Sequence, residues 1–419
     1  MYNKVFDFHN TANSKFQNKI NKSIILNYVK NSSKLTRTLI AKDLKISAPT
    51  VSKIIDKLIA ENYVVEIGKS ESAGGKRAIR LEFNSKFGSV IGVDLGKDRI
   101  RMAVSNMSVN ILDKHVGFEI NNEDEDLLEK VISEINVFIK KVVSKDKNIP
   151  LKAICVGVPA DIETKTGRII SAPLFKKWDN LNLREIFTER LGTEVFVENS
   201  KNISTIGEKN KGEGKIYNNL VFLEVGEGIG AGIVINNQLY RGFSFSAGEV
   251  GFIVDGIENL STTHTAKGYM ENVVSPRNIK KEAIRLISEG NESLIRNIVS
   301  NDLSKIDSGI VCRAAMLKDK LALEIVEKVV QNLAIIVQNI TLIINPQVII
   351  IGGDILGLPD LKTLFIEPMK KMIEKNVPFK IPDIKLSSLG IDGGVIGGLV
   401  LAIENTLNKD FPYIMSRSV

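Results

Sequence analysis

Two apolar helical patterns joined by a tight turn lie within residues 36–61. In the second pattern, apolar residues recur at positions i, i+3, i+4 and i+7, namely Val51, Ile54, Ile55 and Leu58. This spacing predicts one buried face of a helix over 48–61, which Ser47 can cap and whose first turn accommodates Pro49. Another apolar pattern over 18–30 predicts a helix before the pair. The chain is therefore expected to begin with a small three-helix domain that contains a helix-turn-helix.

The outer face of the helix over 48–61 carries hydroxyl and amine groups, on Thr50, Ser52, Lys53 and Lys57. Residues 1–80 hold 15 Lys and Arg against 6 Asp and Glu, whereas the remaining residues hold 41 against 43, so the net charge of +7 arises in the first fifth of the chain. A basic domain with such a face suits the phosphates and base edges of a DNA major groove. We expect double-stranded DNA as its partner; a three-helix interaction module that binds no DNA is the alternative.

A β-hairpin follows, with predicted strands at 63–67 and 78–83 around a turn at 70–75. Lys76 and Arg77 lie in its second half, where a winged helix places basic side chains along a phosphate strand or in a minor groove. The expected DNA-binding residues are Arg37, Thr50, Ser52, Lys53, Lys57, Lys76 and Arg77.

Composition places the chain among ordinary globular proteins, with 43% hydrophobic and 25% charged residues. A length of 419 residues predicts two or three domains. No run of about 18 apolar residues is present and the N-terminus lacks the apolar region of a signal peptide, so no membrane span and no secretion are expected. Cys155 and Cys312 lie far apart among apolar neighbours, which predicts buried thiols in a reducing cytoplasm.

The remaining chain predicts strand–loop–glycine units in two halves. The first half has a strand at 89–96 that ends in Asp-x-Gly, strands near 100–106, 110–115 and 152–158, and a helix over 125–143. The second half has a strand at 220–225 before the glycine loop 226–232, a hairpin at 232–240, a helix over 321–340 and a strand at 348–351 before Gly352-Gly353. This organisation resembles the actin, hexokinase and Hsp70 fold. The predicted class is α/β, with an N-terminal winged helix-turn-helix followed by a two-lobed actin/hexokinase-like (ribonuclease H-like) body.

The motifs together make the chain similar to the ROK family (repressors, open reading frames, kinases), in its repressor branch, whose xylose-type and glucose-type members share this layout. They are the winged helix at 18–83 and the segments 93–96, 156–159, 197–202, 226–232, 240–242, 247–251, 345–353 and 389–394. The resemblance implies three domains: a winged helix-turn-helix at 1–83, a small lobe at 88–197 completed by 396–419, and a large lobe at 198–395.

Three phosphate-handling positions depart from the family's kinases. Asp98 replaces a small hydroxyl residue in the first phosphate loop, Glu227 interrupts the second, and Ser200 stands where the kinases have the Asp that takes the proton from the sugar. We expect no catalytic residues, no cofactor and no enzyme activity. The family's zinc site is absent too, because Phe252 replaces its His and 253–270 contains no Cys, so no metal is expected.

The family's sugar-binding positions correspond to Asn199, Ser200, Glu249, Phe252 and Glu271. Carboxylates suit a neutral sugar, since each accepts hydrogen bonds from neighbouring hydroxyls, and they oppose a phosphate ester. The alternative is that Glu249 and Glu271 are structural loop residues and the effector site is degenerate. The resemblance also places Trp178 in the loop that closes over the sugar, as a lid or as an aromatic that packs within a lobe.

Three functions remain open at this point. The favoured one is a cytoplasmic, sugar-responsive repressor of carbohydrate uptake or catabolic genes, a homodimer or higher homo-oligomer that leaves a pseudo-palindromic operator when a neutral sugar binds between its lobes. The second is a ROK sugar kinase with a DNA-binding head, which the altered phosphate loops disfavour. The third is a DNA-binding regulator whose body only dimerises.

Overall fold

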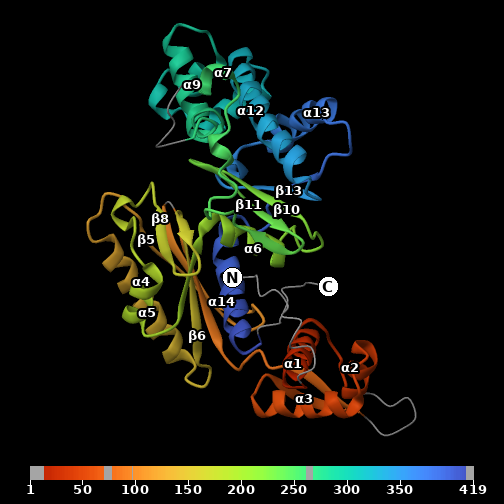
Figure 1. Ribbon diagram of the computed structural model, residues 1–419. Helices are drawn as coiled ribbons and strands as arrows, with labels where there is room; N and C mark the ends of the chain where they lie inside the picture. The colour runs from red at the N-terminus through yellow and green to blue at the C-terminus, as the bar shows by residue number, and fades with distance from the viewer. Residues whose placement is uncertain (1–13, 70–77, 97, 261–267, 412–419) are drawn as a thin grey trace. The chain divides into compact units, whose positions relative to one another are not determined.

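The computed structural model describes residues 14–69, 78–96, 98–260 and 268–411 (Figure 1). The chain divides into two compact units. The first unit comprises Met1–Ile203 and Gly394–Val419, and the second comprises Ser204–Gly393. The chain passes between the units within two helices, α6 (Ser200–Lys211) and α14 (Gly393–Asp410).

The first unit begins with the predicted winged helix-turn-helix. Its elements are α1 (Ser14–Asn31), α2 (Arg37–Leu44), α3 (Ala48–Ala60), β1 (Val64–Lys69) and β2 (Ile79–Phe83). The four apolar residues predicted for the inner face of α3 are all buried, and β1 pairs antiparallel with β2. Ser47 occupies the N-cap position of α3 but caps no backbone group, contrary to expectation. Pro49 lacks an N–H to cap, and the Ser47 hydroxyl instead lies 2.7 Å from the Thr50 hydroxyl.

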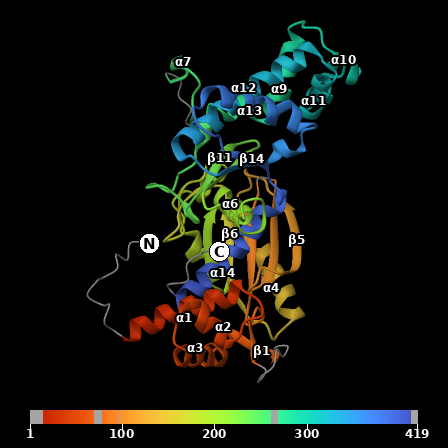
Figure 2. The ribbon, with the colours of Figure 1, turned by 90° about the vertical axis from the view of Figure 1, so that its right-hand side faces the viewer.

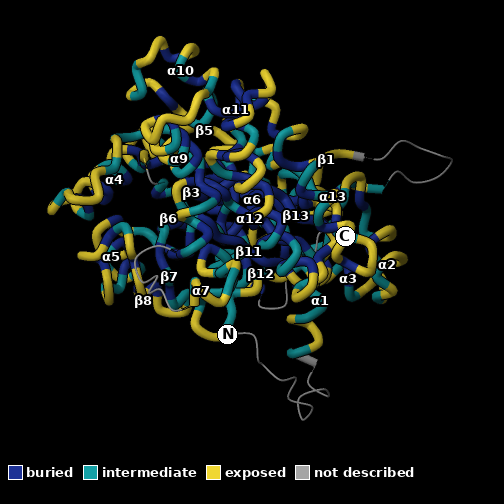
Figure 3. Tube along the Cα trace, turned by 90° about the horizontal axis from the view of Figure 1, so that it is seen from above, coloured by how far each residue is buried: buried dark blue, intermediate teal, exposed yellow. Residues whose placement is uncertain are grey.

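A five-stranded sheet with the order β5-β4-β3-β6-β9 forms the rest of the first unit. Its strands are β3 (Ser89–Leu95), β4 (Arg99–Asn106), β5 (Ile111–Glu119), β6 (Leu151–Val158) and β9 (Val195–Asn199). Helices α4 (Leu127–Lys145) and α5 (Leu183–Leu191) share an apolar core with Ile91 and Val93 on one face of this sheet. Figure 3 shows buried positions along β3 and β6 and exposed positions on the outside of α4.

Helix α14 covers the opposite face of that sheet. Gly92 alternates with Ile91 and Val93, and a Cβ placed on Gly92 would lie only 2.4 Å from the Val395 carbonyl oxygen and 2.8 Å from the Leu399 nitrogen. A short hairpin of β7 (Asp161–Glu163) and β8 (Arg168–Ser171) and a 3-10 turn at Lys176–Trp178 complete the unit. The Trp178 ring is 4% exposed and packs 4.8 Å from the Phe175 ring, so it packs within the lobe and is not a lid.

The second unit contains a sheet with the order β12-β11-β10-β13-β14. Its strands are β10 (Leu220–Val225), β11 (Ile229–Ile235), β12 (Gln238–Tyr240), β13 (Val348–Gly352) and β14 (Asp383–Leu386). Its α-helices besides α6 are α7 (Ile257–Leu260), α8 (Glu271–Val274), α9 (Pro276–Ser288), α10 (Leu294–Ile298), α11 (Ser308–Met316), α12 (Lys320–Ile344) and α13 (Glu367–Asn376). Gly230 and Gly232 pair with β10, so the predicted glycine loop is shorter than expected and spans only 226–228.

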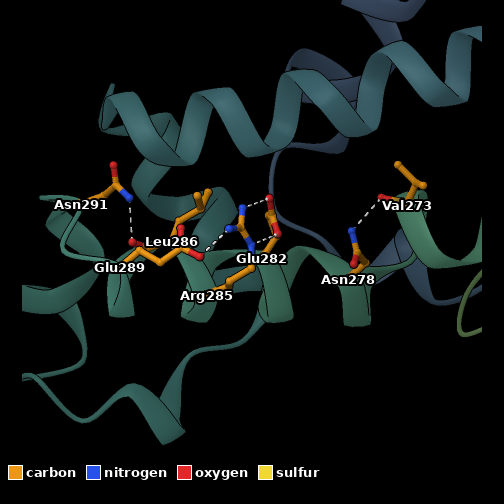
Figure 4. A network of polar contacts seen from close by, with 7 residues as sticks. All are labelled: Val273, Asn278, Glu282, Arg285, Leu286, Glu289 and Asn291. Carbon is orange, nitrogen blue, oxygen red and sulfur yellow. Dashed lines mark hydrogen bonds and ion pairs between the residues drawn. The ribbon is translucent and has the colours of Figure 1, made fainter.

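Helix α9 illustrates how polar side chains define a helix in this unit (Figure 4). Ser275 caps its first turn by accepting from the Asn278 backbone N–H, and the Asn278 amide donates to the Val273 carbonyl 3.1 Å away. The Arg285 guanidinium bridges Glu282 and Glu289 at spacings of three and four residues. These local bonds stabilise a helix whose apolar side faces the core of the unit.

One stretch, Gly390–Asp410, is long and apolar enough to cross a membrane by length and composition alone. Its most apolar window is 61% buried inside the fold, and the core helix of a globular protein passes the same test. Because Leu399, Ala402 and Leu407 of α14 are fully buried, the hydropathy of this helix is accounted for by its packing.

The contact between α14 and β3 should make Gly92 sensitive to substitution. We expect Gly92→Ala to reduce the free energy of unfolding of the first unit by about 1–3 kcal/mol, because the added methyl group meets helix backbone that cannot rotate away. Trp178 is the only tryptophan and lies in this unit, so its fluorescence in urea measures this transition. Val137→Ala, at a site 59% exposed on α4, should change the same value by less than about 0.5 kcal/mol. Equal effects of the two substitutions would contradict the close approach.

Candidate functional site

The outer face of α3 presents two free cationic side chains. Lys53 and Lys57 are exposed one turn apart, and neither makes an ion pair with any described residue. Thr50 and Ser52 lie half-buried near the start of the helix. A second helix of this motif that carries hydroxyls at its start and amines along its face can contact base edges and phosphates in a major groove. DNA contact by these four residues stays a prediction.

Arg37 has a role that the sequence pattern did not reveal. Its guanidinium lies 2.7 Å from an Asp56 carboxylate oxygen and 3.3 Å from one of Glu66, so it ties α2 to α3 and to β1. A guanidinium that serves two carboxylates is already engaged within the head, and DNA contact by Arg37 stays a prediction. Lys76 and Arg77, the predicted wing contacts, lie outside the described residues.

Asn199 and Ser200 lie where β9 ends and α6 begins. The Asn199 amide donates to the Ala160 carbonyl at 2.8 Å and accepts from the Lys201 N–H at 2.8 Å, so its side chain is fixed by the fold. The Ser200 hydroxyl oxygen is shielded from solvent and has no hydrogen-bond partner among the described residues. Shielded polar atoms are nearly always paired, so this hydroxyl is suited to a ligand.

The other three predicted sugar contacts belong to the second unit, where three segments meet. Gly248 has a φ of +91°, and its carbonyl oxygen accepts a hydrogen bond from the Ala231 N–H at 2.8 Å. Gly251 accepts from the Met270 N–H at 2.9 Å, and a Cβ placed on it would lie 3.0 Å from the Glu271 side chain. Side chains at these glycines would collide with Ala231 and Glu271, so the turn after Gly248 lies directly against the start of β11 and against α8.

This arrangement sets Glu271 beside the turn that carries Glu249 and Phe252. The Glu271 carboxylate accepts from the Ile229 N–H at 3.1 Å and from the Gly268 N–H at 3.2 Å, so it braces the three segments. Glu249 is half-buried at the start of the turn, whereas the Phe252 ring is 48% exposed and can stack on a sugar face. A carboxylate next to an exposed aromatic ring suits a polyhydroxylated, uncharged ligand.

An ion pair lies in the first phosphate loop. Asp98 makes a two-pronged ion pair with Arg101, at 3.0 and 2.9 Å, and this hydrogen-bonded guanidinium lowers the pKa of the Asp98 carboxyl. Arg101 therefore offsets part of the negative charge that Asp98 adds to this loop. The ion pair also fastens the loop that a phosphate would have to enter.

The second phosphate loop is contacted by a carboxylate that sequence reasoning missed. Glu227 itself points its exposed side chain to solvent, and its backbone N–H donates to the Asp354 carboxylate at 3.3 Å. A Cβ on Gly226 would lie 2.6 Å from the same carboxylate. Asp354 therefore places a negative charge where the loop's N–H groups would otherwise face an anion. It directly follows the predicted glycine pair 352–353, which is the signal that could have drawn attention to it.

Within residues 14–69, 78–96, 98–260 and 268–411, no three His, Cys, Asp or Glu side chains lie close enough to hold a metal ion. His264, the one histidine near the family's zinc position, lies outside these ranges.

Comparisons with known proteins match both the N-terminal head and the body that follows it. The ROK family profile matches residues 90–405, and a winged helix-turn-helix DNA-binding profile matches 20–65. A xylose repressor of Caldicellulosiruptor bescii is 31% identical over 93% of this chain and 96% of its own length. A glucokinase of Halalkalibacterium halodurans is 30% identical over 76% of this chain and 97% of its own. A crystal structure of a ROK family transcriptional regulator, a homologue of an E. coli protein named MLC, covers 94% of this chain and 98% of its own at a TM-score of 0.79 and 20% identity.

The free lysines of α3 predict how the head binds DNA. On a duplex of arbitrary sequence, Lys53→Ala and Lys57→Ala should each weaken binding and reduce the slope of log affinity against log salt by roughly 0.9, the value for one lost phosphate contact. Fluorescence anisotropy over a salt series measures this slope. Lys140→Ala removes an exposed lysine from α4 and should leave the slope unchanged. A double Lys53→Ala, Arg77→Ala variant with the wild-type slope would show that neither residue faces DNA.

Proposed function

Because this chain belongs to the ROK family, we propose that it is a sugar-responsive regulator of transcription that represses genes of carbohydrate uptake or catabolism. The observation that carries the proposal is the pairing of two features in one chain. A winged helix with free lysines on α3 precedes a ROK body that keeps a carboxylate and aromatic cluster but has altered phosphate loops. The head supplies DNA affinity, and the body supplies the response.

We propose D-xylose as the first effector to test. Xylose repressors are among the relatives that match almost the full chain, and the cluster of Glu249, Phe252 and Glu271 has the chemistry for an uncharged sugar. Glu249 would accept hydrogen bonds from sugar hydroxyls, and Phe252 would stack on an apolar sugar face. Glu271 acts through its brace on Ile229 and Gly268. Asn199 and Ser200 of the first unit, which correspond to sugar contacts of the family, stay predictions.

A sugar kinase with a DNA-binding head is the second candidate, because a glucokinase matches three quarters of the chain. The site argues against it. Ser200 has no described basic partner to take its proton, Asp354 contacts the second phosphate loop, and the Asp98–Arg101 pair fastens the first. We therefore propose that the body binds sugar without transferring a phosphoryl group.

The remaining partners follow from this role. We propose that the protein acts in the cytoplasm as a homodimer or higher homo-oligomer, since two copies of a winged helix bind two half-sites of a pseudo-palindromic operator.

The sugar proposal predicts a selective effect of Glu249. Isothermal calorimetry should detect D-xylose binding by the wild-type protein, and Glu249→Ala should weaken it by about ten- to a hundredfold, the usual loss for hydrogen bonds to a charged group. Affinity for duplex DNA without sugar should stay unchanged. Glu292→Ala, at an exposed site of the same unit, is the matched control.

Glu271→Gln separates bracing from direct contact. The new amide nitrogen cannot accept a backbone N–H as the lost carboxylate oxygen did, so this variant should also lower the thermal stability of the second unit. If Glu249→Ala bound D-xylose normally, the effector site would lie elsewhere. The same calorimetry is applied to a panel of neutral pentoses and hexoses and their phosphate esters. Preferential binding of a phosphate ester would refute the neutral-sugar assignment.

The absence of phosphoryl transfer is a separate prediction. Purified protein with Mg-ATP and D-xylose or D-glucose should release no sugar-dependent ADP in a coupled assay, because no described base stands at Ser200. Turnover of about 1–100 per second, which is typical of kinases, would restore the second candidate. A ROK glucokinase assayed in parallel shows that the assay detects such rates.

A further inference from the structure

The segment that joins the head to the sheet is fastened on both sides. In the structure, the Asn84 N–H donates to the Tyr63 carbonyl and its amide donates to the Asn62 carbonyl, both at 2.9 Å. On the other side, the Ser85 carbonyl accepts from the Met107 N–H at 3.0 Å. The head is therefore bonded to the sheet that follows it and does not hang on a free linker.

An aromatic joint strengthens this connection. It consists of Tyr63 from the head, Phe83 and Phe87 from the connecting segment, and Phe411 directly after α14. The Tyr63 ring lies 4.8 Å from Phe411 and 4.9 Å from Phe87, in both cases edge to face, and Phe87 lies 5.9 Å from Phe83. All three phenylalanines are buried, Phe411 to 1% exposure. Edge-to-face contacts of this kind add orientation to apolar burial.

Two polar contacts fix the joint to the end of α14. The Tyr63 hydroxyl donates to the Asp410 carboxylate at 2.6 Å, across 347 residues of sequence. Burial and this bond raise the pKa of Tyr63, so the phenol remains a donor at physiological pH. The ammonium group of Lys22 in α1 lies 4.9 Å from the centre of the Phe411 ring. Head residues from α1 and from the turn before β1 thus contact Asp410 at the end of α14 and Phe411 directly after it.

The other end of α14 lies where β3 leads into the first phosphate loop. A Cβ on Gly394 would lie 2.4 Å from the Asp94 carboxylate, at the end of β3, and one on Gly398 would lie 3.2 Å from Gly92. Gly393, the first residue of α14, is also the last residue of the second unit. An 18-residue helix spans about 27 Å. Figures 1 and 2 draw α14 as one unbroken helix. Because the helix is continuous, we expect a displacement at its first turn to reach Asp410 and Phe411.

We propose that Tyr63, Asp410 and Phe411 are positioning residues that transmit the placement of α14 to the DNA-binding head. The inference rests on the proposed sugar response, and adds the physical route by which it reaches DNA. A sugar changes DNA affinity only if it favours one arrangement of the protein over another. Helix α14 begins at the boundary between the units and ends at the head. A change in its position would therefore change the position of the head.

The test compares coupling, which is the ratio of DNA dissociation constants with and without saturating D-xylose. Wild-type coupling should lie in the range of about five- to 150-fold that is typical of linked sites. Tyr63→Phe removes only the hydroxyl and Asp410→Asn only the charge, and each should reduce the coupling at least threefold. Xylose affinity measured without DNA should not change, because neither residue lies among the predicted sugar contacts. Tyr28→Phe is the matched control, since Tyr28 donates to Asp43 at 2.6 Å within the head and does not involve α14.

A second measurement needs neither sugar nor DNA. Lys86 is exposed within the fastened segment, and trypsin cleavage after it separates the head from the body. Tyr63→Phe, Asp410→Asn and Phe411→Ala should be cleaved several times faster than wild type, and Tyr28→Phe at the wild-type rate. The urea transition of Trp178 verifies that each variant has folded.

The outcomes separate the inference from the proposed function. Undiminished coupling in both Tyr63→Phe and Asp410→Asn, with a responsive wild type, would overturn the inference and leave the proposed function standing. If no sugar of the panel changes the DNA affinity of the wild-type protein, the proposed effector is wrong. The trypsin cleavage rates then test the aromatic joint without a sugar. Wild-type cleavage rates at Lys86 in all three variants would overturn it.

Discussion

The contact between the backbones of β3 and α14 is the constraint on which the first unit depends. Glycine at 92, 394 and 398 leaves no side chain between strand and helix, so the helix lies directly on the sheet face opposite α4. Its start then meets Asp94 and its end meets the head. A wider separation would remove both contacts at once. One apolar helix thus serves as core, as cover of the sheet and as a connection between two functional ends.

The body keeps the architecture of a sugar kinase while its phosphate-handling loops are changed by local interactions. A kinase loop offers free N–H groups to phosphate, whereas here Asp354 contacts one loop and an ion pair fastens the other. Such changes leave the strand pairing of the two sheets intact, since Arg101 forms its ion pair from within β4 and Asp354 contacts only the loop after β10. The relatives of the chain include both repressors and kinases, so the same fold occurs with both kinds of named function.

The features predicted correctly from the sequence are those set by local periodicity or by motif. The buried face of α3, the strands β3, β6 and β10, the α/β class and ROK membership all follow from such patterns and are confirmed. The missed features depend on partners distant in sequence: Arg37 with Glu66, Asp354 with the 226–228 loop, and Tyr63 with Asp410. The N-cap prediction for Ser47 failed for a local reason, because Pro49 offers no N–H and the Ser47 hydroxyl lies beside the Thr50 hydroxyl. The individual DNA and sugar contacts remain predictions, because ligand geometry is not encoded in any periodicity.

The aromatic joint bonds the head to the body, and this connection is needed if a ligand in the body is to change the DNA affinity of the head. A head on a free linker would keep the same DNA affinity whatever the body did, because no free-energy difference would pass through the linker. Bonds from Asn84 and Ser85 fasten the connecting segment to the head and to the sheet, and the Tyr63–Asp410 bond ties the head to α14. Each is a single hydrogen bond of modest net free energy, so their sum is comparable with the few kcal/mol by which linked sites influence one another. A much stronger joint would add rigidity without adding response, because the ligand can shift the equilibrium only by its own difference in affinity between the two arrangements.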